Sequence, residues 1–187
     1  MTLMLMSGAA SEPVTLGDAR AHLRLDTETE DMLLGAFLTA ARVALEAQTR
    51  RAFVTQSWRL ILDAWPGAVV TLPLAPVSAI TAVTMNDAGA PRTVAPALYD
   101  TALEGDAPRL VANGVWPVPS RRVGGIHIDF TAGYGEAADV PAPLRQAILL
   151  LVAHWFENRE PVSIGDTAGQ LPLSVSALIA PYRLVHL

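Results

Sequence analysis

The stretch that decides the fold spans residues 29–62 and reads TEDMLLGAFLTAARVALEAQTRRAFVTQSWRLIL. In its first part, apolar side chains recur at three- and four-residue intervals, the spacing that places them on one face of an α-helix. These positions are Leu34, Phe37, Leu38, Ala41 and Leu45. From Phe53 onward the period becomes two, which is typical of a β-strand. The stretch therefore predicts a helix over residues 29–49 followed by a strand.

Further helical patterns lie on both sides of this stretch. Thr15 is placed to cap a helix over residues 15–25, with Asp18 at the capping-box position. Residues 143–160 are apolar on nearly all sides and end at Pro161, which terminates a helix. A helix of this kind is buried on more than one side, so we expect one side to face a neighbouring chain. A shorter helix around residues 174–179 follows near the C-terminus.

Strand patterns occupy the region between the helices. Residues 69–74, 77–85 and 125–130 show them, whereas residues 95–119 are weakly patterned. Helices followed by strands and then helices predict an α+β fold. We expect a helical bundle (two N-terminal helices, one long helix near residues 143–160 and a short C-terminal helix) with an inserted small antiparallel β-sheet region.

The expected organisation along the chain has three parts. Residues 1–13 form a flexible leader, because they lack a clear pattern and end at Pro13. Residues 14–161 form the main domain, with helices over residues 15–25, 29–49 and 143–160 and a β-rich insert at about residues 53–131. Residues 162–187 form a C-terminal arm.

Composition excludes several classes of protein. The chain has 187 residues, a formal net charge of −5, 51% hydrophobic residues and 17% charged residues, which excludes intrinsic disorder. All thirteen basic residues are arginine and there is no cysteine, so lysine Schiff bases, disulfides and thiolate chemistry are excluded. The acidic balance argues against a protein that coats nucleic acid. No segment reaches the roughly 20 uninterrupted apolar residues of a membrane span. The mean hydropathy of +0.34 favours a protein whose surface is covered by a partner.

Catalytic and metal-binding patterns are weak. His154 and Glu157 lie one helical turn apart, which is compatible with a metal site, but no second histidine or carboxylate cluster completes one. His127 and Asp129 share one face of a strand, which a solvated polar face explains equally well. No G-x-S-x-G or G-x-G-x-x-G motif is present. We therefore predict no catalytic, cofactor-binding or metal-binding residues and no enzyme activity.

An ordered series of short motifs resembles the head–tail connector (adaptor or head-completion) proteins of long-tailed bacteriophages and of phage-like gene transfer agents. The series begins with the helix from Leu16 to Leu25 and its acidic turn, and continues through the Trp65-Pro66 and Trp116-Pro117 pairs. The remaining members are Ala40-Ala41-Arg42-x-x-x-Glu46-x-x-Thr49-x-Arg51, Trp58, Leu72-Pro73-Leu74-x-Pro76-Val77, Phe130-Thr131-Ala132-Gly133-Tyr134-Gly135, Val140-Pro141-x-Pro143-Leu144, Ala153-His154-Trp155-Phe156-Glu157-Asn158-Arg159-Glu160, Leu171-Pro172 and Pro181-Tyr182-Arg183.

This resemblance implies a structural, non-enzymatic role. Such connectors form a ring, generally of twelve subunits, on the portal protein at the capsid vertex. They link the capsid to a tail-side connector or stopper protein and line the channel through which DNA leaves, without binding DNA specifically or contacting a membrane. The implied location is the capsid–tail junction of a virion or phage-like particle that is assembled in the host cytoplasm. Two alternatives remain: another small phage assembly or binding protein, and a hydrolase that uses His154 and Glu157.

Two sets of residues are candidates for these contacts. We expect the portal and subunit interfaces to include, from the long helix and the C-terminal arm, Leu149, Leu150, Phe156, Leu173, Val175, Leu178, Ile179, Pro181, Tyr182 and Arg183. We expect the channel wall to carry the densest acidic cluster, Asp26, Glu28, Glu30 and Asp31. The same four carboxylates also suit the start of a helix, where they oppose the positive end of the helix dipole.

Overall fold

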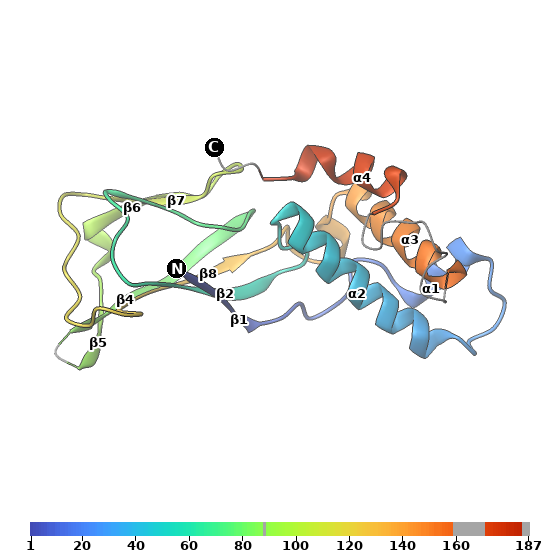
Figure 1. Cartoon of the computed structure of the whole chain (residues 1–187), viewed down its shortest axis with the longest axis horizontal. Coiled ribbons are helices and arrows are strands. Elements are labelled where there is room, and N and C mark those ends of the chain that lie inside the picture. Colours follow the sequence, from blue (N-terminus) through green and yellow to red (C-terminus); the bar gives the residue numbers. More distant parts are fainter. Residues whose placement is uncertain (88, 159–170, 185–187) are drawn as a thin grey trace, which may run out of the picture. The chain divides into compact units, whose positions relative to one another are not determined.

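The computed structural model describes residues 1–87, 89–158 and 171–184 (Figure 1). The chain divides into two compact units, and each is assembled from two segments. The first unit consists of Met1–Ala10 and Val54–Tyr134 and contains the strands. The second unit consists of Ser11–Phe53 and Gly135–Leu187 and contains the α-helices.

The strand unit contains two antiparallel sheets. The five-stranded sheet has the order β1-β2-β8-β4-β5, and the three-stranded sheet has the order β3-β7-β6. The strands of the first sheet are β1 (Thr2–Ser7), β2 (Gln56–Leu62), β8 (Ile126–Ala132), β4 (Val77–Asp87) and β5 (Ala90–Thr93). Those of the second are β3 (Val69–Thr71), β7 (Arg109–Ala112) and β6 (Tyr99–Ala102).

Alternation of side chains fixes the two faces of the larger sheet. Leu60 of β2 and Val83 of β4 both lie opposite Ile128 of β8, and all three side chains are buried. One residue along, Arg59 lies opposite Asp129 on the other face, where Nε and Oδ1 are 2.6 Å apart. A shift of the register by one residue would exchange these faces, so the buried face specifies the pairing.

Tryptophan side chains organise the loops around the smaller sheet. Trp65 and Trp116 stack with ring centroids 4.0 Å apart. Their indole N–H groups donate to the backbone carbonyls of Pro117, over 2.8 Å, and Ala68, over 3.3 Å. These contacts order part of the region 95–119, where the hydrophobic pattern is weak.

Four helices form the second unit: α1 (Leu16–Leu23), α2 (Asp31–Thr49), α3 (Ala142–Glu157) and α4 (Leu173–Ile179). Helix α3 contacts each of the other three. The capping box expected at Thr15 is confirmed: its side chain accepts from the Asp18 N–H, and the Asp18 carboxylate accepts from the Thr15 N–H. Helices α1 and α2 both end on a residue in the left-handed conformation, Arg24 and Arg50 respectively.

A buried arginine joins three segments of the helical unit. Arg42 of α2 is only 8% exposed. Its guanidinium contacts Glu12 over 2.7 Å and Glu46, one turn along α2, over 2.9 Å. The carboxylate of Glu46 also accepts a hydrogen bond from the backbone N–H of Phe53 over 2.8 Å. The pair Arg42–Glu46 is therefore part of the core and not a solvated surface pair.

The predicted helical bundle with a small inserted sheet is wrong. The described part of the chain contains eight strands in two antiparallel sheets, and these belong to a compact unit that is distinct from the helical unit. The fold is a mixed α and β structure in which helices are not dominant. The prediction failed because β1 and the strands within residues 95–119 depend on pairing with distant segments, which local periodicity does not reveal.

Both ends of the chain also differ from the expected organisation. Residues 2–7 lie within the expected flexible leader but form β1, which pairs with β2. The C-terminal arm, expected over residues 162–187, contains α4 and the short helix Ala180–Tyr182, which pack within the helical unit. Residues 162–170 and 185–187 of that arm lie outside the described residues.

Candidate functional site

Helix α3 presents a buried stripe and a partly exposed side. Leu144, Ile148, Leu151 and Val152 are at most 1% exposed. The predicted interface residues Leu149, Leu150 and Phe156 are partly exposed. Trp155 is also partly exposed and lies edge-on to Phe37 of α2, with ring centroids 6.1 Å apart. Although α3 is apolar on nearly all sides, only one of its sides is fully buried within its own chain.

The C-terminal segment is anchored on its own unit. Val175 and Ile179 are completely buried, so as the chain is folded here they are not available to a partner. Arg51 donates from Nε to the backbone carbonyl of Tyr182 over 2.6 Å, and its guanidinium carbon lies 6.0 Å from the centre of the Tyr182 ring. The N–H of Leu184 donates to the carbonyl of Thr49 over 3.1 Å.

The remaining residues of the predicted C-terminal interface differ in accessibility. Leu173 is 89% exposed, Pro181 and Arg183 are exposed, and Leu178 is partly exposed. The sequence did not predict the anchoring contact of Arg51, since the Arg50-Arg51 doublet has the appearance of ordinary charges at a helix end. Only the tertiary position of Tyr182 reveals its role.

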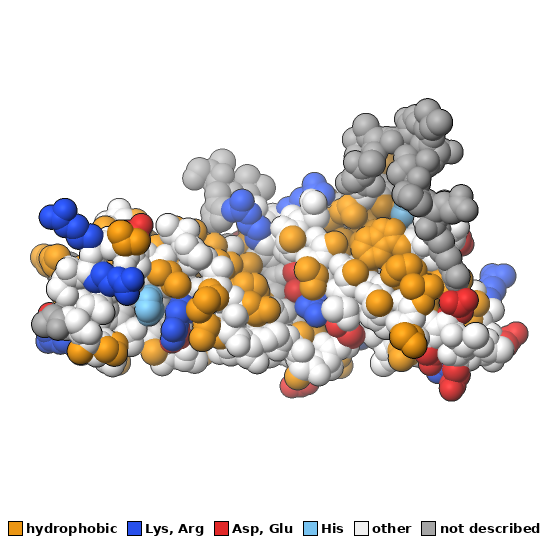
Figure 2. Space-filling view, turned by 60° about the horizontal axis from the view of Figure 1, so that its bottom comes forward, with side chains coloured by type: hydrophobic (Ala, Val, Ile, Leu, Met, Phe, Trp, Pro, Cys, Tyr) orange, Lys and Arg blue, Asp and Glu red, His pale blue; other side chains and the backbone are white. Residues whose placement is uncertain are grey.

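The acidic turn between α1 and α2 is partly neutralised by Arg20. Its guanidinium lies 3.0 Å from Glu28 and 3.6 Å from Asp31. Asp26 and Glu28 are exposed, and Glu30 and Asp31 are partly exposed. Figure 2 shows acidic side chains gathered at the right of the view, beside an area of hydrophobic side chains. The turn thus remains acidic, with a lower net charge than four carboxylates alone would give.

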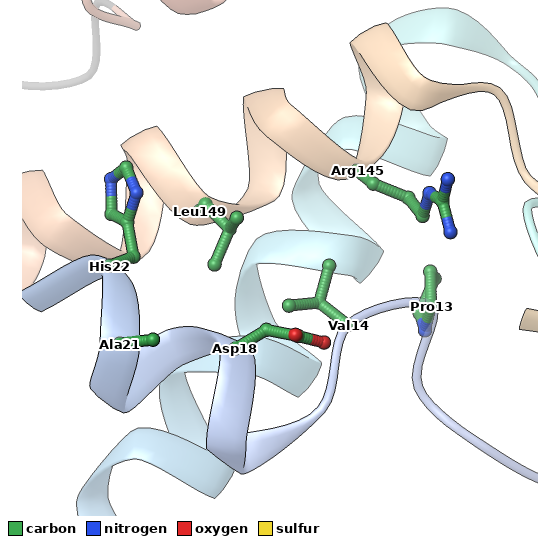
Figure 3. Close-up of a pocket in the computed structure, with 7 residues that line it drawn as sticks. All are labelled: Pro13, Val14, Asp18, Ala21, His22, Arg145 and Leu149. Atoms are coloured by element: carbon green, nitrogen blue, oxygen red, sulfur yellow. The ribbon is translucent and has the colours of Figure 1, made fainter.

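An open pocket of about 360 Å³ lies between α1 and α3 (Figure 3). Pro13, Val14, Ala21 and Leu149 supply apolar walls, and the polar lining consists of Asp18, His22 and Arg145. Hydrogen bonds from the Thr15 side chain and backbone, helped by the positive charge of Arg145, hold the pKa of Asp18 below its ordinary value. A shallow apolar surface with charges of both signs around it is typical of a protein contact.

The candidate metal and catalytic residues do not form a cluster. In the described residues, no three histidine or acidic side chains lie close enough together to hold a metal ion. His154 is exposed, and its neighbour is Asn158, whose side-chain amide donates to the His154 carbonyl over 2.8 Å. His186 lies outside the described residues. Within the described ranges, no helix is both long and apolar enough to span a membrane.

The described chain has the features of an assembly subunit: apolar side chains exposed on helices and a sheet edge, and an open pocket with mixed charges. No family model matches the sequence. No curated protein sequence matches it. Solved structures do.

Three of these solved structures cover the whole chain. The chain matches over 100% of its length a protein in the neck of an empty gene transfer agent particle, computed with C6 symmetry, with 34% identity, a TM-score of 0.85 and 97% of that protein covered. A chain from the virion of a native gene transfer agent particle gives 35% identity and a TM-score of 0.82, again with 97% covered. A chain from the neck of a native particle, computed with C12 symmetry, gives 32% identity and a TM-score of 0.81, with 97% of that chain covered.

Identity above 30% over the whole of this chain and 97% of each matched chain establishes the relationship, and the TM-scores of 0.81 to 0.85 show that the fold agrees. The chain belongs to the head–tail connector proteins of gene transfer agent particles. It is a structural component, and its location is the neck of the particle. The resemblance in the sequence motifs to connector proteins is thereby confirmed.

Proposed function

We propose that this protein is the subunit of a closed ring, a dodecamer, that sits on the portal protein at the capsid vertex and carries a tail-side connector or stopper protein. The observation that carries the proposal is the match at 32% identity over the full chain to a protein in a neck computed with C12 symmetry. The role is one of assembly and not of catalysis.

The interface between subunits is heterologous in such a ring, so each chain needs two different contact surfaces. One is the partly exposed side of α3, with Leu149, Leu150 and Phe156. Leu149 also lines the pocket of Figure 3, together with Arg145 and Asp18, so apolar and charged contacts are available side by side. Exposed Leu173, Pro181 and Arg183 are the part of the C-terminal segment that a portal protein could contact without unfolding α4.

DNA passes through the lumen of the proposed ring without specific binding. The acidic turn of Asp26, Glu28, Glu30 and Asp31 is the proposed channel-facing surface. Carboxylates repel the phosphate backbone and release no counterions on contact, so they favour sliding over adhesion. The formal net charge of −5 acts in the same direction.

Native mass spectrometry and negative-stain microscopy of the purified protein, alone and with its portal protein, test the proposal. We expect a closed ring of twelve copies on the portal and no measurable affinity for duplex DNA at physiological salt. A chain that remains monomeric with the portal, or binds elsewhere on the particle, contradicts the proposal. Tight DNA binding contradicts the proposed acidic channel wall but not the proposed ring.

A further inference from the structure

Strand β1 is an open edge of the five-stranded sheet. In the described part of the chain β1 pairs with β2 alone, so the peptide groups along its other side have no strand partner. Its sequence, TLMLMS, contains no charge, no proline and no glycine. Edge strands with these properties readily pair with another chain.

Apolar side chains are exposed on both faces of β1. Leu5 lies opposite Trp58 and Met4 lies opposite Arg59, so these two neighbours point to opposite faces of the sheet. They are 48% and 41% exposed, and Met6 is 49% exposed. Nothing within the sheet therefore covers either face of this strand well.

The opposite edge of the same sheet is protected. Strand β5 has only four residues, and these include Pro91, which has no N–H to offer, and the exposed charge of Arg92. Proline and charge are the usual means by which a sheet edge prevents pairing with other chains. The chain blocks one edge and leaves the other open, which indicates that the open edge is used.

We propose that β1 is completed in the assembled ring by an extended segment of the adjacent copy of this chain. The peptide groups of an open edge require a strand as partner, and alternate side chains then pack on both faces. The proposal rests on the proposed ring: in a ring of identical copies, the molecule beside each subunit is another copy. A closed ring requires contacts between two different surfaces, so the partner segment is not the β1 of the next copy.

A β-bulge limits the length of this contact. The pairing of β1 with β2 shifts register between Leu5 and Ser7. A bulge twists a strand and interrupts regular pairing at that point. The added strand therefore pairs with residues 2–5, and Met6 and Ser7 lie beyond its end.

Photo-crosslinking tests the proposal directly, because the chain has no cysteine of its own. A single Met4→Cys substitution in the full chain is labelled with a cysteine-reactive benzophenone, and assembled rings are irradiated and digested for mass spectrometry. We expect covalent dimers that join residue 4 to a different segment of another copy. A matched Thr93→Cys variant on the blocked edge gives the background.

Each other outcome overturns the inference in a distinct way. Rings that form but give no product above the Thr93→Cys background show that β1 is not an interface. Products that join β1 to β1, or β1 to a different protein, show that the partner of β1 is not a different segment of the adjacent copy. If the unsubstituted chain forms no ring with its portal, both the inference and the proposed function fail.

A charge on the open edge provides the second measurement. We expect Leu5→Lys to lower the fraction of chains in rings by about tenfold at a fixed concentration, because a buried lysine opposes strand pairing. Thr93→Lys, on the blocked edge, leaves that fraction unchanged. Full ring formation by a correctly folded Leu5→Lys variant overturns the proposal. If circular dichroism shows that this variant is misfolded, the crosslinking result alone decides whether β1 is an interface.

Discussion

Arg51 holds Tyr182 through a 2.6 Å hydrogen bond from its Nε atom to the Tyr182 backbone carbonyl, across more than half of the length of the chain. The Arg51 side chain is buried, and its guanidinium also faces the Tyr182 ring. Together with the bond from Leu184 to Thr49, this contact fixes the C-terminal segment to the end of α2. The C-terminal segment is thus part of the folded unit before any partner arrives.

Arg51→Ala is expected to release this segment. Loss of a hydrogen bond to a charged group costs about 1.5–3 kcal/mol. Hydrogen exchange should accelerate in residues 173–184 while the strand unit keeps its protection. Arg50→Ala is the matched control, because Arg50 is exposed and precedes Arg51 directly. Equal exchange in both variants would contradict the anchoring role.

Burial of α4 leads to a second expectation, opposite to that for a free arm. Ile179→Ala should lower the free energy of unfolding of the helical unit by about 2–5 kcal/mol, because it leaves a cavity in the core. Leu173→Ala, at the exposed start of the same helix, should change it by less than about 0.5 kcal/mol. Thermal or denaturant unfolding measures both changes. An Ile179→Ala variant with unchanged stability would indicate that the C-terminal segment is a free arm and not part of the core.

Helix α3 should separate folding from assembly. Leu151 is 1% exposed, so Leu151→Ala should cost about 2–5 kcal/mol of stability. Leu150 is partly exposed, so Leu150→Glu should leave the subunit folded and impair its assembly on the portal. Circular dichroism during heating and native mass spectrometry give the two readouts. The same loss of thermal stability in both variants would show that no such division exists.

Residues with a local signal were predictable from the sequence. The Thr15–Asp18 capping box needs only neighbouring residues, and the alternation in β2 and β8 reflects a sheet with one buried face. The placement of β1 depends on its pairing with β2, more than fifty residues away, and nothing local distinguishes it from a loose leader. Strand pairing between distant segments was therefore the main reason why the predicted fold was wrong.

Candidate interface residues were harder to predict, because composition does not say which partner covers an apolar side chain. Val175 and Ile179 have the pattern of an exposed amphipathic helix, yet they are buried within their own unit. Arg42 and Glu46 have the spacing of a solvated pair, and only the tertiary position of Glu12 and Phe53 makes them a buried network. In each case the deciding contact comes from a distant segment.

Arg42 is expected to be among the most sensitive positions of the helical unit. Arg42→Met removes both ion pairs and leaves the largely buried carboxylate of Glu46 without its cation, which costs about 3–5 kcal/mol. The triple variant, in which Glu12→Gln and Glu46→Gln are added to Arg42→Met, should recover part of that loss, because no unpaired charge remains. Unfolding in urea measures the difference, and no recovery in the combined variant would show that packing, and not charge, dominates at this site.

The capping box of α1 should make stability depend on pH through Asp18. The hydrogen bonds that Thr15 donates, and then the charge of Arg145, hold the pKa of Asp18 below its ordinary value of 3.8. A carboxylate whose pKa is lower in the folded state stabilises the fold fully above its unfolded pKa, and the contribution is lost as the pH falls through the folded value. Asp18→Asn keeps an acceptor for the Thr15 N–H but does not titrate. The advantage of the unsubstituted chain over this variant should therefore be constant near neutral pH and shrink below pH 3.8. Urea unfolding of both chains across the acidic range measures it, and an advantage that stays constant into that range would show that Asp18 acts only as a neutral acceptor.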